Sequence, residues 1–120
     1  MTRPDMIKLN ENTNKWVLGS RPAAIKLSNT LQIKYNLNPK SKLEKEVWHK
    51  HINTIEECYL VLNGEMKIKI EHEIFTLKQR EMLHVPPNFC HKIIWCTENL
   101  EYLTIRAPPS DSSTKILCDT

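Results

Sequence analysis

The chain has 120 residues, of which 40% are hydrophobic, and this fits one folded domain with a modest core. Its formal charge is only +3 and the charged residues are interspersed, so we expect neither nucleic acid nor a membrane as a partner. No segment approaches the roughly 20 apolar residues that cross a bilayer, and residues 1–14 lack the apolar stretch of a signal peptide. These features predict a cytoplasmic protein.

The first predicted strand in the chain lies near residue 31, where Leu31, Ile33 and Tyr35 alternate with polar residues. A period of two predicts that these three side chains form its buried face. The apolar run over residues 58–62 indicates a strand that is covered on both faces. Asn63-Gly64 follows it, and this dipeptide predicts a hairpin to a strand over residues 66–70.

Further short strands are expected after a turn at residues 71–73, over 74–77, 82–85, 91–95 and 100–106. The strand over 82–85 ends at Pro86-Pro87, because proline cannot donate a hydrogen bond to a sheet. Strands spaced by roughly 8–12 residues predict an all-β sandwich or barrel. We expect residues 1–25 to form an N-terminal segment that could contain a strand, 26–107 the barrel, and 108–120 a C-terminal loop or tail whose end docks back.

The cysteines are Cys58, Cys90, Cys96 and Cys118, and they are not arranged as the CxxC pairs of structural zinc sites. In a reducing compartment all four are expected to be free thiols. Cys90 and Cys96 would pair only in an oxidising compartment and with suitable geometry.

The most informative stretch for function is Trp48-His49-Lys50-His51. Residues two apart on a strand point to the same side, so His49 and His51 present two imidazoles together, as a metal site needs. Glu57 follows with Glu56 beside it, and His91 comes directly after the turn over residues 86–90. A single histidine is more often a surface or core residue than a ligand, so the metal hypothesis depends on the combination.

The two remaining histidines are not expected to be ligands. His72 falls in a predicted turn and should be exposed. His84 precedes Pro86 on a strand, where it either supports a ligand from behind or points outward.

The stretch from His49 to Trp95 resembles the two motifs of the cupin superfamily. The first, G-(x)5-H-x-H-(x)3,4-E-(x)6-G, is matched by His49, His51, Glu57 and Gly64, with one extra residue before the glutamate. Taking Glu56 as the ligand repairs that gap but spoils the spacing to Gly64.

The second motif, G-(x)5-P-x-G-(x)2-H-(x)3-N, is matched at Pro86 and His91. Asn88 replaces its second glycine, which is tolerable because asparagine adopts left-handed backbone conformations more readily than most residues. The other departures are Leu43 and Arg80 in place of opening glycines, and Trp95 in place of the final asparagine.

The resemblance implies a jelly-roll β-barrel, usually a dimer, that holds one divalent ion (Fe, Mn, Ni or Zn) with His49, His51, Glu57 and His91. It also implies an enzyme that acts on a small organic substrate, and dioxygenases, which are oxidoreductases, are one common outcome. A metal-dependent isomerase, epimerase or lyase is an alternative, as are a non-catalytic ligand-binding barrel and a barrel that has lost its metal.

Strand parity predicts the wall of the pocket around the ion. Its predicted residues are Tyr59, Val61, Ile93 and Trp95, with Phe75, Met82, Tyr102 and Arg106 as further candidates. For each of them, plain barrel core is the simpler interpretation. Lys34 and Arg106 could clamp an anionic group, although solvated surface charge is the simpler reading. Apolar side chains of the opposite parity, at Cys58, Leu60 and Leu62, would need a cover and predict a homodimer.

Overall fold

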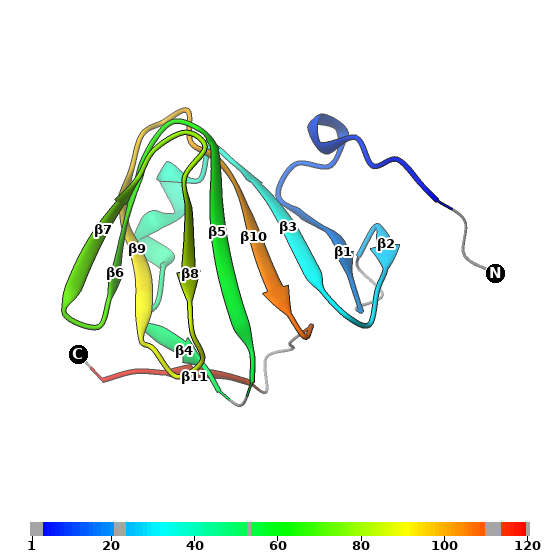
Figure 1. Cartoon of the computed structure of the whole chain (residues 1–120). Coiled ribbons are helices and arrows are strands. Elements are labelled where there is room, and N and C mark those ends of the chain that lie inside the picture. Colours follow the sequence, from blue (N-terminus) through cyan, green and yellow to red (C-terminus); the bar gives the residue numbers. More distant parts are fainter. Residues whose placement is uncertain (1–3, 21–23, 53, 110–113, 120) are drawn as a thin grey trace.

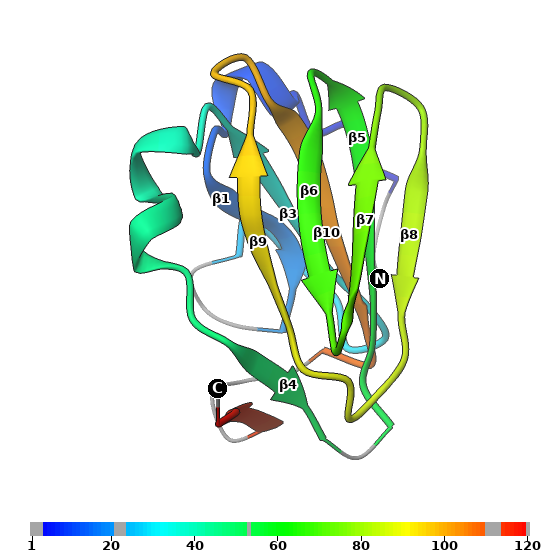
Figure 2. The same cartoon turned by 90° about the vertical axis from the view of Figure 1, so that its left-hand side faces the viewer.

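The computed structural model describes residues 4–20, 24–52, 54–109 and 114–119, and its elements are strands and two short 3₁₀ helices (Figures 1 and 2). The helices are η1 (Leu9–Glu11) and η2 (Lys40–Lys45). The strands are β1 (Lys15–Gly19), β2 (Lys26–Leu27), β3 (Gln32–Leu37), β4 (His49–His51), β5 (Glu56–Asn63), β6 (Met66–Ile70), β7 (Glu73–Leu77), β8 (Met82–Val85), β9 (His91–Cys96), β10 (Glu101–Ala107) and β11 (Lys115–Leu117).

The strands form two sheets that face each other. One has six strands in the order β2-β1-β3-β10-β5-β8, and the other has five in the order β11-β4-β9-β6-β7. Side chains of alternating parity fill the space between them, for example Tyr59 and Val61 of β5 and Met66, Ile68 and Ile70 of β6. The prediction of an all-β, jelly-roll type of fold is therefore confirmed. None of the helices in the described ranges is long and apolar enough to span a membrane.

The turn at Asn63-Gly64 is confirmed, but the hairpin predicted from it is wrong. Gly64 has φ +81°, and a Cβ atom there would lie 2.5 Å from Oγ1 of Thr97. The strands on either side, β5 and β6, lie in opposite sheets, so the turn carries the chain across the barrel. The hairpin of this region is β6–β7, whose turn at Glu71 and His72 was expected.

The buried face predicted for β3 is only partly confirmed: Tyr35 is 2% exposed, but the polar parity of the strand faces the interior of the barrel. Its polar parity, Gln32, Lys34 and Asn36, lies opposite Arg106, Thr104 and Tyr102 of β10, on the inner side of the sheet. The Asn36 amide accordingly donates to Oγ1 of Thr104 at 3.1 Å and to the carbonyl of Tyr102 at 3.3 Å. The alternation predicted the strand correctly, but this end of the barrel has a polar interior.

The C-terminal strand docks back, as expected, and brings a cysteine with it. β11 pairs with β4, and the chain then places Cys118 6.2 Å from Cys90 (Cα to Cα), where the two form a disulfide. The prediction of free thiols is therefore wrong for this pair, because the sequence did not show that these distant segments meet. Cys58 and Cys96 are free.

Candidate metal centre

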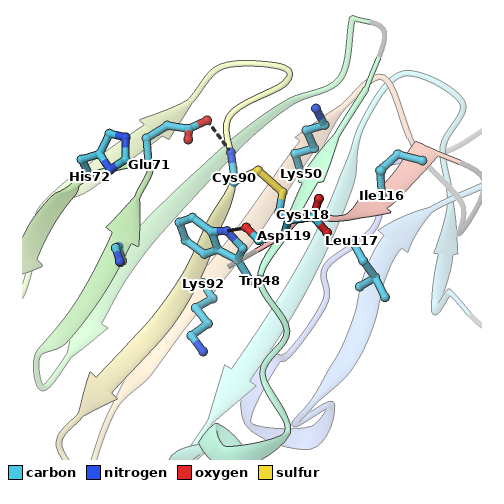
Figure 3. A pocket seen from close by; sticks show the side chains of 11 residues that line it. Trp48, Lys50, Glu71, His72, Cys90, Lys92, Ile116, Leu117, Cys118 and Asp119 are labelled. Atoms are coloured by element: carbon cyan, nitrogen blue, oxygen red, sulfur yellow. Dashed lines mark hydrogen bonds between the residues drawn. A yellow bond between two sulfur atoms is a disulfide. The ribbon is translucent and has the colours of Figure 1, made fainter.

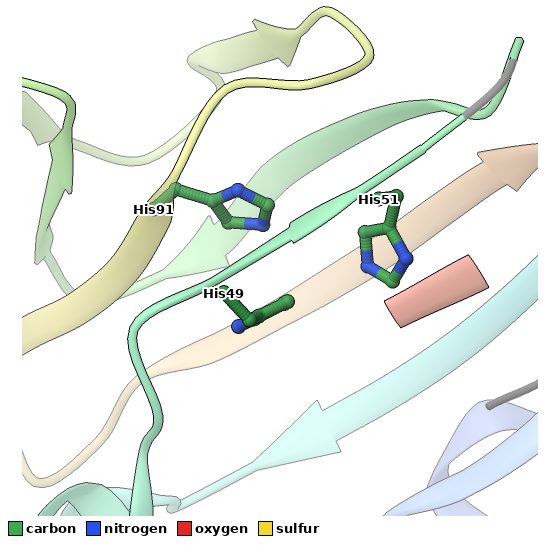
Figure 4. A group of neighbouring side chains, drawn as sticks. All are labelled: His49, His51 and His91. Atoms are coloured by element: carbon green, nitrogen blue, oxygen red, sulfur yellow. The ribbon is translucent and has the colours of Figure 1, made fainter. Parts of the chain in front are cut away.

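Three histidines from two neighbouring strands meet inside the barrel. His49 and His51 come from β4, and His91 begins β9, where it lies directly opposite His49. Their side chains are buried, with relative exposures of 6%, 3% and 1%. One ring nitrogen from each of the three lies within 4.8 Å of the others, so the group could hold a metal ion (Figure 4).

Backbone carbonyls fix the orientation of two of these rings. Nδ1 of His49 lies 2.8 Å from the carbonyl oxygen of Val47, and Nδ1 of His91 lies 2.9 Å from that of Phe89. Because a carbonyl oxygen only accepts, each Nδ1 must carry the proton. Such a bond is the usual support behind a metal-ligating imidazole, and it directs Nε2 toward the centre.

Nε2 of His49 and Nδ1 of His51 are buried and have no hydrogen-bond partner among the described residues. Leaving a buried polar atom unpaired costs about 1–3 kcal/mol, and a metal ion would satisfy such a nitrogen. Burial lowers the pKa of His49 to about 4, although the hydrogen bond to Val47 acts in the opposite direction. The imidazole is therefore neutral at ordinary pH, which is the form that binds a metal.

Glu57 lies beside two of the imidazoles. Its Oε1 is 3.1 Å from Nε2 of His91, and its Oε2 is 3.3 Å from Nε2 of His51. The Tyr59 hydroxyl and Nε of Arg106 both donate to the same carboxylate. Burial alone would raise the pKa of Glu57, but its close contacts with the two histidines and the charge of Arg106 hold it well below its usual value.

Of the two candidate glutamates, only Glu57 faces the histidine cluster. Glu57 is 1% exposed and faces the imidazoles, whereas the Glu56 side chain is 58% exposed and contacts His84 at 2.8 Å. His84 is therefore an outward residue, and His72 is exposed in its turn, as predicted.

The predicted pocket wall is only partly correct. Tyr59, Ile93, Tyr102 and Arg106 line a cavity next to His49, while Val61 and Phe75 belong to the packed core. The prediction that Met82 lines the pocket is wrong. Its side chain lies opposite Leu60 on the outer face of the sheet and is 63% exposed.

The prediction that Trp95 lines the pocket is also wrong, because its side chain is 40% exposed. The ladder between β6 and β9 pairs Ile68 with Ile93 but Lys67 with Trp95, so one extra residue, Ile94, interrupts the register. A bulge of this kind reverses the parity that follows it. The sequence carries no mark of it.

The cavity also contains residues that the sequence analysis did not single out. They are Trp16, Asn36, Glu46, Thr104 and Lys115. Trp16 lies in the segment expected to be N-terminal to the barrel, and no pattern in the sequence links Lys115 to the histidines.

Two positions that depart from the glycines of the motifs have left-handed backbones. Arg80 has φ +69° and Asn88 has φ +70°. The fold therefore needs the conformation that glycine adopts most readily, and the chain reaches it with other residues.

A groove of about 560 Å³ lies elsewhere, beside the Cys90–Cys118 disulfide (Figure 3). Trp48, Lys50 and Lys92 line it, and none of the three clustered histidines does. It is therefore distinct from the candidate metal centre.

The fold and the site together define a class: small two-sheet β-barrels with a cluster of buried imidazoles inside. Residues 36–106, more than half of the chain, match the family described as the cupin domain. The chain belongs to the cupin superfamily, as the motifs indicated.

Individual relatives are distant. A Methanocaldococcus jannaschii protein described as uncharacterized is 35% identical over a 79-position alignment, and the match covers 61% of this chain and 59% of that protein. The structure described as DMSP lyases RdDddP and RnDddQII has a TM-score of 0.65 at 18% identity, over 87% of this chain and 51% of that one. A cupin-2 domain protein from Shewanella frigidimarina has a TM-score of 0.55 at 27% identity, over 67% of this chain and 72% of that one.

This chain spans only about half to three-fifths of the length of the first two of these proteins. The likeness to the lyases shows the fold alone.

Proposed function

We propose that this protein is a metal-dependent enzyme that acts on a small organic substrate at one divalent ion, held by His49, His51, Glu57 and His91. The observation that carries the proposal is the buried group of three imidazoles, of which His49 and His51 have ring nitrogens without a hydrogen-bond partner among the described residues. Imidazole and carboxylate ligands suit Fe, Mn, Ni or Zn, and the donor set does not choose among them. A bound ion of this kind would polarise a substrate oxygen or, if redox-active, support oxygen chemistry.

Dioxygenase chemistry is the first candidate reaction, because four protein ligands leave open positions on an ion of higher coordination number. Arg106 and the Tyr59 hydroxyl both donate hydrogen bonds to the Glu57 carboxylate, which orients it and favours its ionised form. The chain's own residues therefore provide a charged, pre-oriented site from which water is largely excluded.

A lyase or isomerase reaction is the second candidate, and Tyr59 favours it. This tyrosine is buried beside the centre, with its ring centroid 6.2 Å from that of His91, and its hydroxyl shares a hydrogen bond with Glu57. Burial, followed by the Glu57 charge, raises its pKa well above the usual value, so at neutral pH it is a protonated hydrogen-bond donor beside the centre. Oxygen uptake during turnover supports the first candidate, and product formation under nitrogen supports the second.

A non-catalytic ligand-binding role is the alternative to an enzyme. Candidate substrates that bind without being converted would support this role. The cytoplasmic location stays a prediction. Disulfides are uncommon in reducing compartments, so the Cys90–Cys118 bond weighs against it.

Elemental analysis of the purified protein tests the metal centre. We expect about one equivalent of a first-row ion in the wild type and a loss of most of it in His49→Ala and His91→Ala. His72→Ala is the matched control, because this histidine is exposed and lies outside the cluster. Equal metal content in the wild type and in both cluster variants would contradict the proposal.

A further inference from the structure

The cavity next to His49 is small and unusually cationic. Its volume is about 190 Å³, below the roughly 300–1,000 Å³ of typical ligand pockets. Its charged lining consists of Lys34, Arg106, Lys115 and a single carboxyl group, Glu46.

Arg106 is held in place before any ligand arrives. Its Nε donates to Glu57, and its Cζ lies 5.0 Å from the ring centroid of Trp16. A guanidinium group has five N–H donors, so the bond to Glu57 leaves most of them available. Donors that are already oriented cost little entropy when they bind an anion.

Lys34 is the second fixed cation. It is half-buried, and its Nζ lies 5.9 Å from the Trp16 ring, on the strand next to the one that carries Arg106. Within the described parts of the chain it forms no ion pair. Burial, and then the charge of Arg106, lower the pKa of Lys34, and a bound anion would raise it.

We propose that the substrate or ligand of this site is a small organic acid, whose carboxylate lies between Lys34 and Arg106 while another of its oxygens faces the three histidines. The inference extends the proposed function, since it names the class of molecule that approaches the metal. Lys34 is then a residue that selects for negative charge without being a metal ligand.

Calorimetry on the metal-loaded protein tests this with pairs of acids and amides of nearly equal size: lactate and lactamide, glycolate and glycolamide, pyruvate and pyruvamide. We expect at least one acid to bind at least about tenfold more tightly than its amide, since hydrogen bonds to charged groups contribute about 1.5–3 kcal/mol. Lys34→Met should lose at least about tenfold in affinity for that acid, with unchanged metal content.

Two further variants serve as controls. Lys34→Arg keeps the charge and should retain the binding of the acid, whereas a purely structural role for Lys34 would not distinguish Met from Arg. Lys78→Met removes an exposed lysine just after β7 that does not line the cavity, and should leave binding unchanged.

The outcomes separate this inference from the proposed function. If the protein holds its metal but acids and amides bind equally, if no acid binds, or if Lys34→Met binds the acid as well as the wild type does, the inference is overturned and the metal proposal stands. Sulfate or phosphate binding as tightly as the best organic acid would also overturn it, because the site would then select only for charge. A wild-type protein that takes up no metal overturns the proposed function itself.

Discussion

Cys118 is bonded to Cys90, the residue directly before His91 (Figure 3). The strand that leads to Cys118, β11, pairs with β4 and places Leu117 opposite His49. The C-terminal segment therefore covers the strand that carries two of the imidazoles and is joined covalently to the loop before the third.

Replacing both bonded cysteines, in Cys90→Ser/Cys118→Ser, should lower the free energy of unfolding by about 3 kcal/mol. The disulfide joins residues 28 positions apart, and closing a loop of that length restrains the unfolded chain by about this amount. Urea denaturation without reductant measures the difference. Cys58→Ser, which removes a free thiol, is the control and should have a much smaller effect. Four reactive thiols in the unreduced, denatured wild type would contradict the disulfide.

The shared inward face of His49 and His51 could be predicted from sequence because it depends only on local geometry: residues two apart on a strand share a face. The face of β3 that points into the barrel could not be predicted in this way. Leu31, Ile33 and Tyr35 have the pattern of a buried face, yet the interior at this end is polar, and Lys34 lines the cavity. Hydrophobic periodicity finds the strand but assigns its face wrongly where polar side chains line the interior, as they do here.

Gly64→Ala tests the turn that carries the chain from one sheet to the other. Its φ of +81° strains any side chain, and the new Cβ would lie 2.5 Å from Oγ1 of Thr97 and 3.0 Å from Cα of Leu100. We expect a destabilisation of at least about 2 kcal/mol, measured by thermal or urea unfolding. Gly19→Ala is the control, with its nearest contact at 3.3 Å to a flexible side chain, and should cost clearly less. Equal effects would contradict this account of the turn.

Glu57→Gln should weaken metal binding by about tenfold or more. The substitution preserves the size of the side chain but removes the charge that Arg106 and the two histidines face. Glu56→Gln changes the same chemistry one residue earlier, on an exposed side chain, and should leave metal affinity unchanged. Competition with a chromophoric chelator measures both affinities. If Glu56→Gln has the larger effect, the assignment of Glu57 is wrong.

We expect the tyrosines to lose their protons at a higher pH in the folded protein than in the unfolded chain. Burial and the hydrogen bond to Glu101 raise the pKa of Tyr35 to about 12, and burial also raises those of Tyr59 and Tyr102. These are the chain's three tyrosines. The folded protein should therefore show little tyrosinate absorbance at pH about 11, whereas in urea the transition should lie near pH 10.

This difference also sets the sign of a stability effect. Between about pH 10 and 12 the unfolded chain loses tyrosine protons that the folded chain retains, so the free energy of unfolding must fall as pH rises through this range. Tyr35→Phe should reduce that slope. A folded protein whose tyrosines titrate as they do in urea would contradict their burial.

The outer face of the six-stranded sheet has rows of apolar side chains. Leu103 lies opposite Leu60, which in turn lies opposite Met82, and Ile105 lies opposite Cys58. Leu60, Leu103, Ile105 and Cys58 are only half-buried, and Met82 is 63% exposed. An apolar sheet face of this kind is expected to be covered by a partner, and a second copy of the chain provides a complementary one.

We therefore expect a homodimer, with a mass by light scattering of twice the 14.1 kDa of one chain at micromolar concentration. Met82→Lys places a charge on this face and should weaken the dimer by about tenfold or more, because the ammonium group would lose water on association. Ile74→Lys is the matched control: this residue is 57% exposed but lies on β7 of the other sheet, so the dimer should persist. A monomeric wild type would contradict the interface, and an equal effect of the two variants would place it elsewhere.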